Sequence, residues 1–258
     1  MMILIKLGGS VITDKSKYKV FNKDRVARLC EEIKASGKDA VIVHGAGSFG
    51  HVVAKEFQLQ NGYSEDSQIP AVAKVSHDMR VLNNMFMDAV IDAGMNAVSI
   101  PPGACFEMED GELVGDASVL MGYLELGIMP VMFGDVILDV KKRFGIVSGD
   151  KVMETLASLF SPECVVFVSD IDGLYDKDPK ANKNAKLIEM VDNDVLKEVA
   201  TDITVDDVTG GVRAKMETML RMTTSDRECI LVNGKVEGRL YELLSGKDVI
   251  CTRAKGGI

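Results

Sequence analysis

Short apolar runs recur along the chain and are rich in aliphatic and β-branched residues. They lack the alternation of a half-exposed strand, which is typical of strands buried on both faces of a parallel sheet. We predict strands at Met2–Leu7, Ala40–His44, Ala97–Ile100, Pro130–Phe133, Cys164–Ser169, Glu228–Val232 and Val249–Cys251.

Segments with apolar residues three and four positions apart lie between these runs, as in amphipathic helices. We predict helices at Asp24–Ala35, Ile69–Ala93, Ala117–Leu126, Lys151–Phe160, Leu196–Thr201, Val212–Thr223 and Gly238–Leu244. The alternation of strand and helix predicts an α/β fold, a three-layer α/β/α sandwich with a largely parallel central sheet.

Two places break this alternation with β-hairpin patterns, and both lie in the N-terminal part. Asp110-Gly111 separates two short strand-like runs and supplies the positive φ of a tight turn; a second pair of runs flanks Lys141–Arg143. The strand-like runs are Cys105–Met108, Glu112–Val114, Val136–Val140 and Phe144–Val147. We therefore expect two domains, 1–148 and 149–258, that share a continuous sheet.

Glycine-rich turns follow several of the predicted strands. They are Gly8-Gly9-Ser10, Gly45–Gly50, Ser148-Gly149-Asp150 and Asp170–Tyr175, with Thr209-Gly210-Gly211 before a helix. Each fits an ordinary strand-to-helix turn. Together they predict an anion site, because the carboxyl ends of parallel strands meet at one edge and exposed backbone N–H groups there bind phosphates.

Two familiar nucleotide motifs do not account for these turns. Gly45–Gly50 matches G-x-G-x-x-G, but the segment before Glu65 and Asp66 is polar and does not read as the strand that a dinucleotide fold needs. The P-loop pattern is absent, because no Gly-Lys pair precedes Ser or Thr.

Composition narrows the classes of protein. The chain has 258 residues, 47% of them hydrophobic, and a formal charge of −9, which indicates a globular protein and disfavours binding to nucleic acid or anionic membranes. No run reaches the roughly 18–20 apolar residues of a membrane helix. The N-terminus lacks the features of a secretory signal, so we expect a cytoplasmic protein.

The five cysteines are isolated in the sequence. Cys30, Cys105, Cys164, Cys229 and Cys251 form no C-x-x-C pair and no zinc-ligand spacing. We expect free thiols and no protein metal site.

Four spaced motifs together resemble the amino-acid kinase superfamily, which includes acetylglutamate, aspartate, carbamate and uridylate kinases. They are Lys6–Ser10, His44–Gly47, Ser169–Tyr175 followed by Asp178-Pro179, and Thr209–Gly211 with Lys215. The extension Ser48–His51, together with Lys15, resembles isopentenyl phosphate kinases of archaeal type and the related fosfomycin-modifying kinases. Ala46 departs from the usual Gly-Gly-Gly loop only by a methyl group.

This resemblance implies an ATP-dependent kinase that phosphorylates isopentenyl phosphate to isopentenyl diphosphate, with dimethylallyl phosphate as a second candidate acceptor. It places the acceptor in the N-terminal domain and ATP in the C-terminal domain, and implies a homodimer formed through the N-terminal part. Mg²⁺ is expected on the oxygens of ATP.

Charged residues near the glycine turns are the candidate catalytic groups, because phosphoryl transfer depends on positioning and charge neutralisation. Lys6, a charge in an apolar strand, is assigned to the β- and γ-phosphates. The resemblance makes Lys15 a transition-state stabiliser, Lys215 a nucleotide contact and Asp150 an organiser of the lysines. A solvated loop lysine, a surface helical lysine and an N-terminal helix residue are the respective alternatives.

The remaining site residues divide between two ligands. His51 is expected to hydrogen-bond the acceptor's non-transferring phosphate, unless it only caps a helix; His44 and His77 are interpreted as structural. ATP is expected at Lys6, Gly8, Gly9, Ser10, Ala46, Gly47, Asp170, Gly173, Leu174, Tyr175, Asp176, Pro179, Gly210 and Lys215, and the acceptor at Gly45, Ala46, Gly50, His51, Gly149, Val72, Met79 and Phe86. The last three equally fit a plain core.

Two alternatives stay open from the sequence. One is a kinase for another phosphate or phosphonate acceptor, fosfomycin included. The other is a non-catalytic relative that stores or senses an anion or nucleotide, although such a protein needs no transition-state lysine. Lys6, Lys15, Lys215 and His51 are predicted to meet at one edge of the sheet, so we expect a positive cleft on a negative body.

Overall fold

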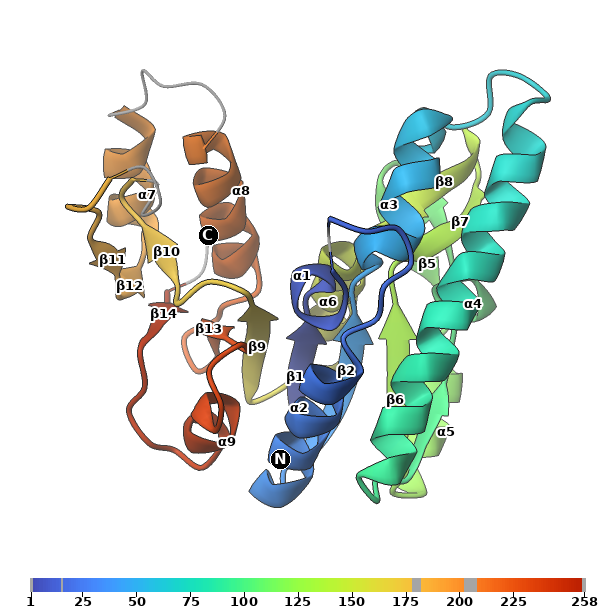
Figure 1. Ribbon diagram of the computed structural model, residues 1–258. Helices are drawn as coiled ribbons and strands as arrows, with labels where there is room; N and C mark the ends of the chain where they lie inside the picture. The colour runs from blue at the N-terminus through green and yellow to red at the C-terminus, as the bar shows by residue number, and fades with distance from the viewer. Residues whose placement is uncertain (1, 15, 178–181, 202–207, 257–258) are drawn as a thin grey trace.

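An eight-stranded sheet forms the centre of the protein in the computed structural model, which describes residues 2–14, 16–177, 182–201 and 208–256 (Figure 1). All its neighbouring strands are parallel except one antiparallel pair, β13 with β14. The strand order is β12 (Met190–Val191), β14 (Cys251–Ala254), β13 (Glu228–Asn233), β9 (Cys164–Ser169), β1 (Met2–Leu7), β2 (Asp39–His44), β6 (Met129–Phe133), β3 (Ala97–Ser99).

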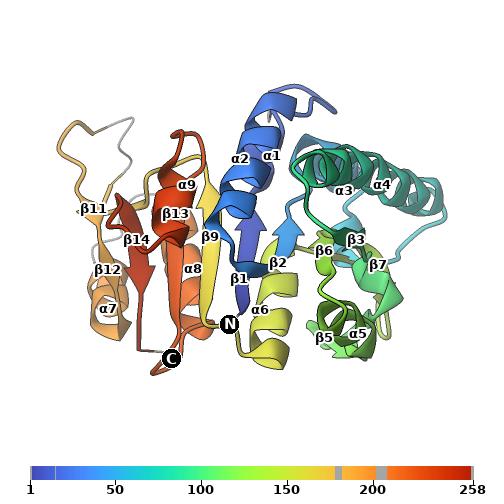
Figure 2. The same ribbon diagram turned by 90° about the horizontal axis from the view of Figure 1, so that it is seen from below.

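Helices cover both faces of this sheet (Figure 2). One face carries α1 (Gly9–Ile12), α2 (Lys23–Ser36), α3 (Gly47–Glu56), α4 (Gln68–Asp92) and α9 (Arg239–Leu244). The other carries α5 (Ser118–Glu125), α6 (Gly149–Phe160), α7 (Asn193–Thr201) and α8 (Val208–Arg221). The predicted three-layer α/β/α sandwich is therefore confirmed.

Strand β1 shows how the sequence divides between the two faces. Ile3, Ile5 and Leu7 belong to the core on the α2 side, whereas Leu4 belongs to the core on the α6 side. Because side chains alternate along a strand, Lys6 lies on the same face as Leu4. The one charge of this strand is thus directed toward α6 and α8.

Both predicted hairpins are confirmed and join in a second sheet. Its order is β5 (Glu112–Gly115), β4 (Phe106–Glu109), β7 (Asp135–Asp139), β8 (Arg143–Val147). The turn at Asp110 and Gly111 has φ values of 51° and 84°, as a tight hairpin turn requires. Figure 1 shows this sheet beyond the carboxyl end of β6, so it extends the N-terminal part at that edge of the central sheet.

Several elements differ from the prediction. Helices α1 and α3 begin within glycine turns that were expected to be loops, and the last strand lies at β14 instead of Val249–Cys251. The short strands β10 (Leu174–Tyr175), β11 (Leu187–Ile188) and β12, and the 3₁₀ turns η1 (Leu59–Asn61) and η2 (Pro102–Ala104), were not expected. Glycine has a low helix propensity, so these helix starts depend on tertiary packing.

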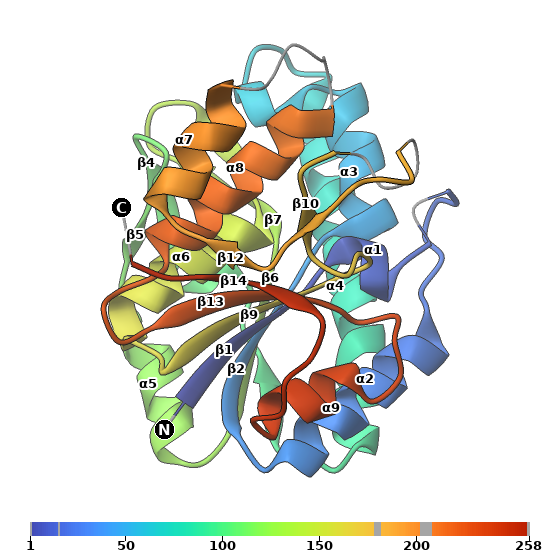
Figure 3. The same cartoon turned by 90° about the vertical axis from the view of Figure 1, so that its left-hand side faces the viewer.

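The two predicted domains share one sheet, because β1 pairs with β9 in register from Ile3 with Cys164 to Leu7 with Val168. Figure 3 shows β14, β13, β9, β1 and β2 side by side in this continuous sheet. The boundary near Ser148 lies where its side chain accepts the N–H of Lys151 and caps α6. None of the described helices is both long and apolar enough to cross a membrane.

Candidate active site

A pocket of about 140 Å³ lies at the carboxyl ends of β1, β2 and β6, near the starts of α1, α3 and α6. Figure 1 shows these strands and helices. Three of the glycine turns predicted to converge contribute to its lining, at Gly9, at Gly45 and at Gly149. The lining residues are Lys6, Gly9, Gly45, Ala46, Gly50, His51, Ala54, Val75, Met79, Gly134, Asp135, Ile146, Val147, Ser148, Gly149 and Asp150.

Lys6, Asp150 and Lys215 form a charged group at one end of this pocket. Lys6 Nζ lies 2.7 Å from Asp150 Oδ1, and Lys215 Nζ lies 3.6 Å from the same oxygen. Both ammonium groups also face the ring of Phe167, at 5.7 and 5.1 Å from its centroid. One carboxylate therefore holds two lysines from different elements, which leaves one positive charge uncompensated within the group.

Burial and these charges shift the pKa values of the pair. Burial lowers the pKa of Lys6, and the charge of Lys215 lowers it further, whereas Asp150 acts in the opposite direction. Burial alone would raise the pKa of Asp150, but the two lysines outweigh it and hold that pKa below its ordinary value. Asp150 is therefore ionised at neutral pH and can orient both lysines.

Close backbone contact between two glycine turns shapes the floor of the pocket. A Cβ atom on Gly9 would lie 2.5 Å from Gly47 N, and one on Gly45 would lie 2.6 Å from Gly9 N. Thr13 ties the same turns together, because its hydroxyl donates to Gly9 O at 2.7 Å and accepts from Ser48 N at 3.1 Å. The first turn of α3, with its N–H donors, is thus held against the charged end.

The opposite end of the pocket is apolar. The apolar lining residues are Ala54, Val75, Met79 and Ile146, and His51, from the first turns of α3, also lines the pocket. A pocket with one cationic and one apolar end suits a small amphipathic anion.

Two residues expected at the apolar end lie elsewhere. Phe86 is fully buried, with its ring centroid 4.9 Å from that of His44, and Val72 packs at the edge of the core. Neither lines the pocket, although each lies seven residues along α4 from Met79 and therefore on the same helical face. Met79 does line it, and Val75 of the same helical face joins it.

Asp135 lines the pocket and was not singled out from the sequence. Its buried carboxylate pairs with Arg80 of α4 and accepts the N–H of Val136 at 2.9 Å, and the Arg80 guanidinium lies 5.6 Å from the centroid of Phe133. Burial raises the pKa of Asp135, and Arg80 opposes that rise. The signal in the sequence was an aspartate after Gly134, directly beyond a predicted strand.

Residues expected to hold the nucleotide lie at the carboxyl end of β9, next to the charged group. Gly8 N donates to Val168 O at 2.9 Å, and Asp170 Oδ2 lies 3.4 Å from Lys235 Nζ. Leu174 N donates to Thr252 Oγ1 at 2.8 Å, which holds the Gly173–Tyr175 turn against β14. This turn is therefore built by contacts within the chain.

The other expected site residues lie as follows. Asp176 accepts the N–H of Lys186 at 2.7 Å, Ser10 lies in α1, and Gly210 lies in α8. Lys15 and Pro179 lie outside the described residues. Across the described ranges, no three His, Cys, Asp or Glu side chains group so as to hold a metal ion.

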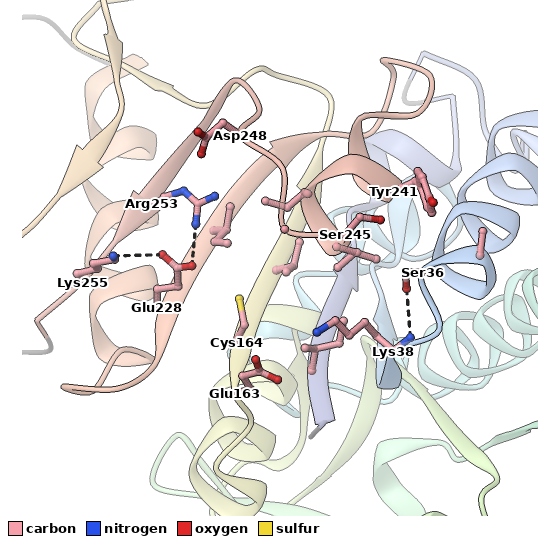
Figure 4. A pocket seen from close by; sticks show the side chains of 17 residues that line it. Ser36, Lys38, Glu163, Cys164, Glu228, Tyr241, Ser245, Asp248, Arg253 and Lys255 are labelled. Atoms are coloured by element: carbon pink, nitrogen blue, oxygen red, sulfur yellow. Dashed lines mark hydrogen bonds and ion pairs between the residues drawn. The ribbon is translucent and has the colours of Figure 1, made fainter.

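A larger hollow, of about 820 Å³, lies at the opposite edge of the sheet (Figure 4). Glu228 pairs there with Arg253 at 2.7 Å and with Lys255 at 3.8 Å, and Glu163 and Asp248 add further negative charge. Burial raises the pKa of the Cys164 thiol to about 12, so it is not a nucleophile at neutral pH. We place the candidate active site at the smaller pocket.

Comparison with known proteins agrees with this geometry. The model of the amino acid kinase family matches residues 1–233. An isopentenyl phosphate kinase of Thermoplasma acidophilum is 37% identical over 94% of this chain and 96% of its own length.

Solved structures give the same result. An isopentenyl phosphate kinase structure superposes with a TM-score of 0.84 at 30% identity, covering 98% of this chain and 100% of that one. A substrate complex of an isopentenyl phosphate kinase superposes with a TM-score of 0.80 at 36% identity, with the same coverage. The chain therefore belongs to the amino acid kinase family, in which it is similar over its whole length to the isopentenyl phosphate kinases.

Proposed function

We propose that this protein transfers the γ-phosphoryl group of ATP to isopentenyl phosphate, giving isopentenyl diphosphate and ADP. The observation that carries the proposal is the pocket itself: at its charged end Lys6 and Lys215 share Asp150, and Val75 and Met79 are among its apolar lining residues. A small prenyl phosphate has the same two ends. The relatives named isopentenyl phosphate kinase support the same substrate.

The reaction needs neither a covalent intermediate with the protein nor a general base. A phosphate monoester carries between one and two negative charges at neutral pH, because its second pKa is near 6. Its oxygen can therefore attack the γ-phosphorus of ATP without a general base, forming one P–O bond while the bond to the β-phosphate oxygen breaks. The main obstacle is repulsion between the two anions.

Lys6 and Lys215 lower that repulsion. The ammonium groups of both lysines approach one oxygen of Asp150, so the carboxylate holds them in one place before substrate arrives. Preorganised charges in a partly buried site stabilise developing charge better than water does, because they need no reorganisation during the reaction. Lys6 is the residue we assign to the transferring phosphoryl group.

His51 and the turns around Gly45 and Gly50 would bind the acceptor phosphate, with Ala46 and Gly149 beside them. In this proposal His51 donates to a non-transferring oxygen and favours a phosphate over a carboxylate acceptor. Lys15 is proposed to stabilise the transition state. Mg²⁺ bound to the oxygens of ATP would neutralise part of the triphosphate charge.

The remaining parts of the proposal concern the rest of the chain. The turn from Asp170 to Asp176, with Gly210 of α8, would hold the nucleotide of ATP in the C-terminal half. The N-terminal half would form a homodimer, and the enzyme would act in the cytoplasm. The apolar residues at the acceptor end suit dimethylallyl phosphate as well as isopentenyl phosphate.

A coupled ADP-release assay tests this function with isopentenyl phosphate, dimethylallyl phosphate, fosfomycin and uridylate as acceptors. We expect the highest kcat/KM with isopentenyl phosphate. A higher value with fosfomycin would assign the protein to the phosphonate kinases. No ADP release with any acceptor would favour a sensor or storage protein.

The role of His51 is tested with the same assay. We expect His51→Ala to lower kcat/KM for isopentenyl phosphate by about 100-fold, because a hydrogen bond to a charged group contributes about 1.5–3 kcal/mol. His77→Ala, on the exposed part of α4, is the matched control and should change it less than twofold. A loss below threefold in His51→Ala would contradict the assignment.

A further inference from the structure

His44, at the carboxyl end of β2, is completely buried between two aromatic rings. Its ring centroid lies 4.9 Å from that of Phe86 and 5.2 Å from that of Phe133, with which it is stacked. Burial lowers the pKa of His44 to about 4, so the imidazole is neutral at physiological pH. The ring does not line the pocket, but the next two residues, Gly45 and Ala46, do.

The hydrogen bonds of His44 determine which ring nitrogen carries the proton. Nδ1 lies 3.1 Å from Gly45 O, and a carbonyl oxygen can only accept, so Nδ1 must be the donor. In a neutral ring Nε2 then has a lone pair and accepts from Asn83 Nδ2 at 3.1 Å. The other end of the Asn83 amide, Oδ1, accepts from the Ser99 hydroxyl. The buried chain from Ser99 through Asn83 to His44 is therefore directed toward the Gly45 carbonyl.

The position of this carbonyl also sets the direction of the neighbouring N–H group. In a planar trans peptide the C=O and N–H bonds point in opposite directions. The Gly45 oxygen faces the buried His44 ring, so the N–H of Ala46 points away from that ring. Within the described part of the chain, no backbone or side-chain acceptor takes this N–H group.

The preceding peptide unit, His44–Gly45, is fixed by two backbone hydrogen bonds. His44 O accepts from Gly134 N at 3.1 Å, and Gly45 N donates to Leu7 O at 2.9 Å. The remaining freedom of the Gly45–Ala46 peptide is rotation about its flanking bonds, which glycine permits in either direction. The Nδ1–H bond of His44 removes that freedom.

We infer that His44 is a positioning residue, whose Nδ1–H group holds the Gly45 carbonyl inward and thereby aims the Ala46 N–H at the phosphate in the pocket. The inference rests on the proposed function for the identity of that phosphate. His44 itself touches no substrate. If its bond is lost, the peptide can rotate and present a carbonyl oxygen, which repels an anion.

Two substitutions separate this role from simple packing. An Asn amide nitrogen can take the place of Nδ1, whereas a Gln side chain can take the place of Nε2 but not of Nδ1. We expect His44→Asn to retain kcat/KM for isopentenyl phosphate within about fivefold and His44→Gln to lower it about 10–100-fold, mainly in kcat, by analogy with loss of one anion-binding donor. The KM for ATP should change less than twofold in both.

Both variants lose the imidazole ring, so their melting temperatures should fall by similar amounts. Equal losses of kcat/KM in the two variants, in step with stability, would show that His44 only fills space. A His44→Gln variant with the kcat/KM of the wild type would likewise overturn the inference.

A spectroscopic measurement tests the same inference without turnover. The chain has three histidines, so ¹⁵N-labelled imidazoles can be assigned. We expect a protonated Nδ1 and an unprotonated Nε2 in His44 at pH 7, and the opposite tautomer would refute the inference.

The amide of Ala46 gives a second signal. It should shift when isopentenyl phosphate binds to the wild type and to His44→Asn, and much less in His44→Gln; equal shifts in all three would contradict the inference. If the wild type binds isopentenyl phosphate but releases no ADP, the proposed function fails, while these spectra still decide the role of His44.

Discussion

The two edges of the central sheet carry ion pairs of the same length in very different settings. At the carboxyl edge Lys6 lies 2.7 Å from Asp150, and at the amino edge Arg253 lies 2.7 Å from Glu228. The Lys6 side chain is 11% exposed and the Arg253 side chain 27%, whereas the two carboxylates do not differ in this direction, since Asp150 is 35% and Glu228 25% exposed. Lys6 also lies beside touching glycine turns, and the pair at the amino edge lies in a hollow about six times larger.

The difference shows that the larger of the two hollows need not be the ligand-binding site. Acidic and basic side chains at the amino edge are balanced in number, since Lys38, Arg253 and Lys255 face Glu163, Glu228 and Asp248. At the carboxyl edge a buried cation and backbone N–H groups converge because parallel strands end there and helices begin. The effective dielectric constant is lower in a partly buried site than in water. A charge there therefore has a stronger electrostatic interaction with a ligand.

Removing the cation at each edge is the strongest test of this comparison. We expect Lys6→Met to lower kcat about 10³-fold or more, because it removes the preorganised charge that we assign to the transferring phosphoryl group. Arg253→Met, the matched change at the amino edge, should alter kcat less than threefold. Comparable losses in steady-state kcat would show that the two edges do not differ in function.

The next largest effect on kcat/KM is expected from the close backbone contact between Gly9 and Gly47. Gly9→Ala places a Cβ atom 2.5 Å from Gly47 N, so the two turns must separate, and a displacement of this size can lower kcat/KM about 100-fold. Gly122→Ala, in α5 with no atom near its Cβ position, should keep its activity and gain up to about 1 kcal/mol of stability. Activity and melting temperature are measured together, and full activity in Gly9→Ala would refute the contact's role.

The pH dependence of kcat/KM should distinguish the carboxylate of Asp150 from that of Glu228. Lys6 must be protonated to act, and burial lowers its pKa below the ordinary value of 10.5, so kcat/KM should fall as the pH rises toward that lowered value. Asp150 raises the pKa of Lys6. We therefore expect Asp150→Asn to lower kcat/KM about 10–100-fold at pH 7 and to move the alkaline limb to lower pH.

Glu228→Gln is the control at the amino edge, and its profile of kcat/KM against pH should match that of the wild type. An alkaline limb that stays in place or moves upward in Asp150→Asn would contradict the coupling of Lys6 to Asp150.

The smallest expected effect concerns the apolar end of the pocket. Met79→Ala should raise kcat/KM for longer prenyl phosphates about tenfold relative to isopentenyl phosphate, since a methylene group in an apolar pocket changes discrimination by about 1–3 kcal/mol. Phe86→Ala removes core packing instead and should cost about 3–5 kcal/mol of unfolding free energy, with the chain-length preference unchanged. A preference that moves equally in both would place Phe86 at the pocket.

Single residues show how far the sequence leads toward this site. Lys6, Asp150 and the turns at Gly45 and Gly149 could be predicted, because a charge in an apolar strand and glycines after strands are local signals. Asp135 follows Gly134 beyond a predicted strand, but its pairing with Arg80 joins two elements and could not be predicted. Phe86 and Met79 lie on the same face of α4. Only their positions along the helix decide that Phe86 packs in the core and Met79 lines the pocket.

The order of apolar runs, helical periods and glycine turns by itself determined a parallel α/β sheet and placed the proposed site at its carboxyl edge. Those features are local, since periodicity and turn residues depend on near neighbours in the chain. Only the tertiary structure decided that Lys6 shares Asp150 with Lys215 and that the buried His44 ring faces the Gly45 carbonyl. Such contacts join residues whose mutual distance and orientation follow from how whole layers pack, which no short stretch of sequence specifies.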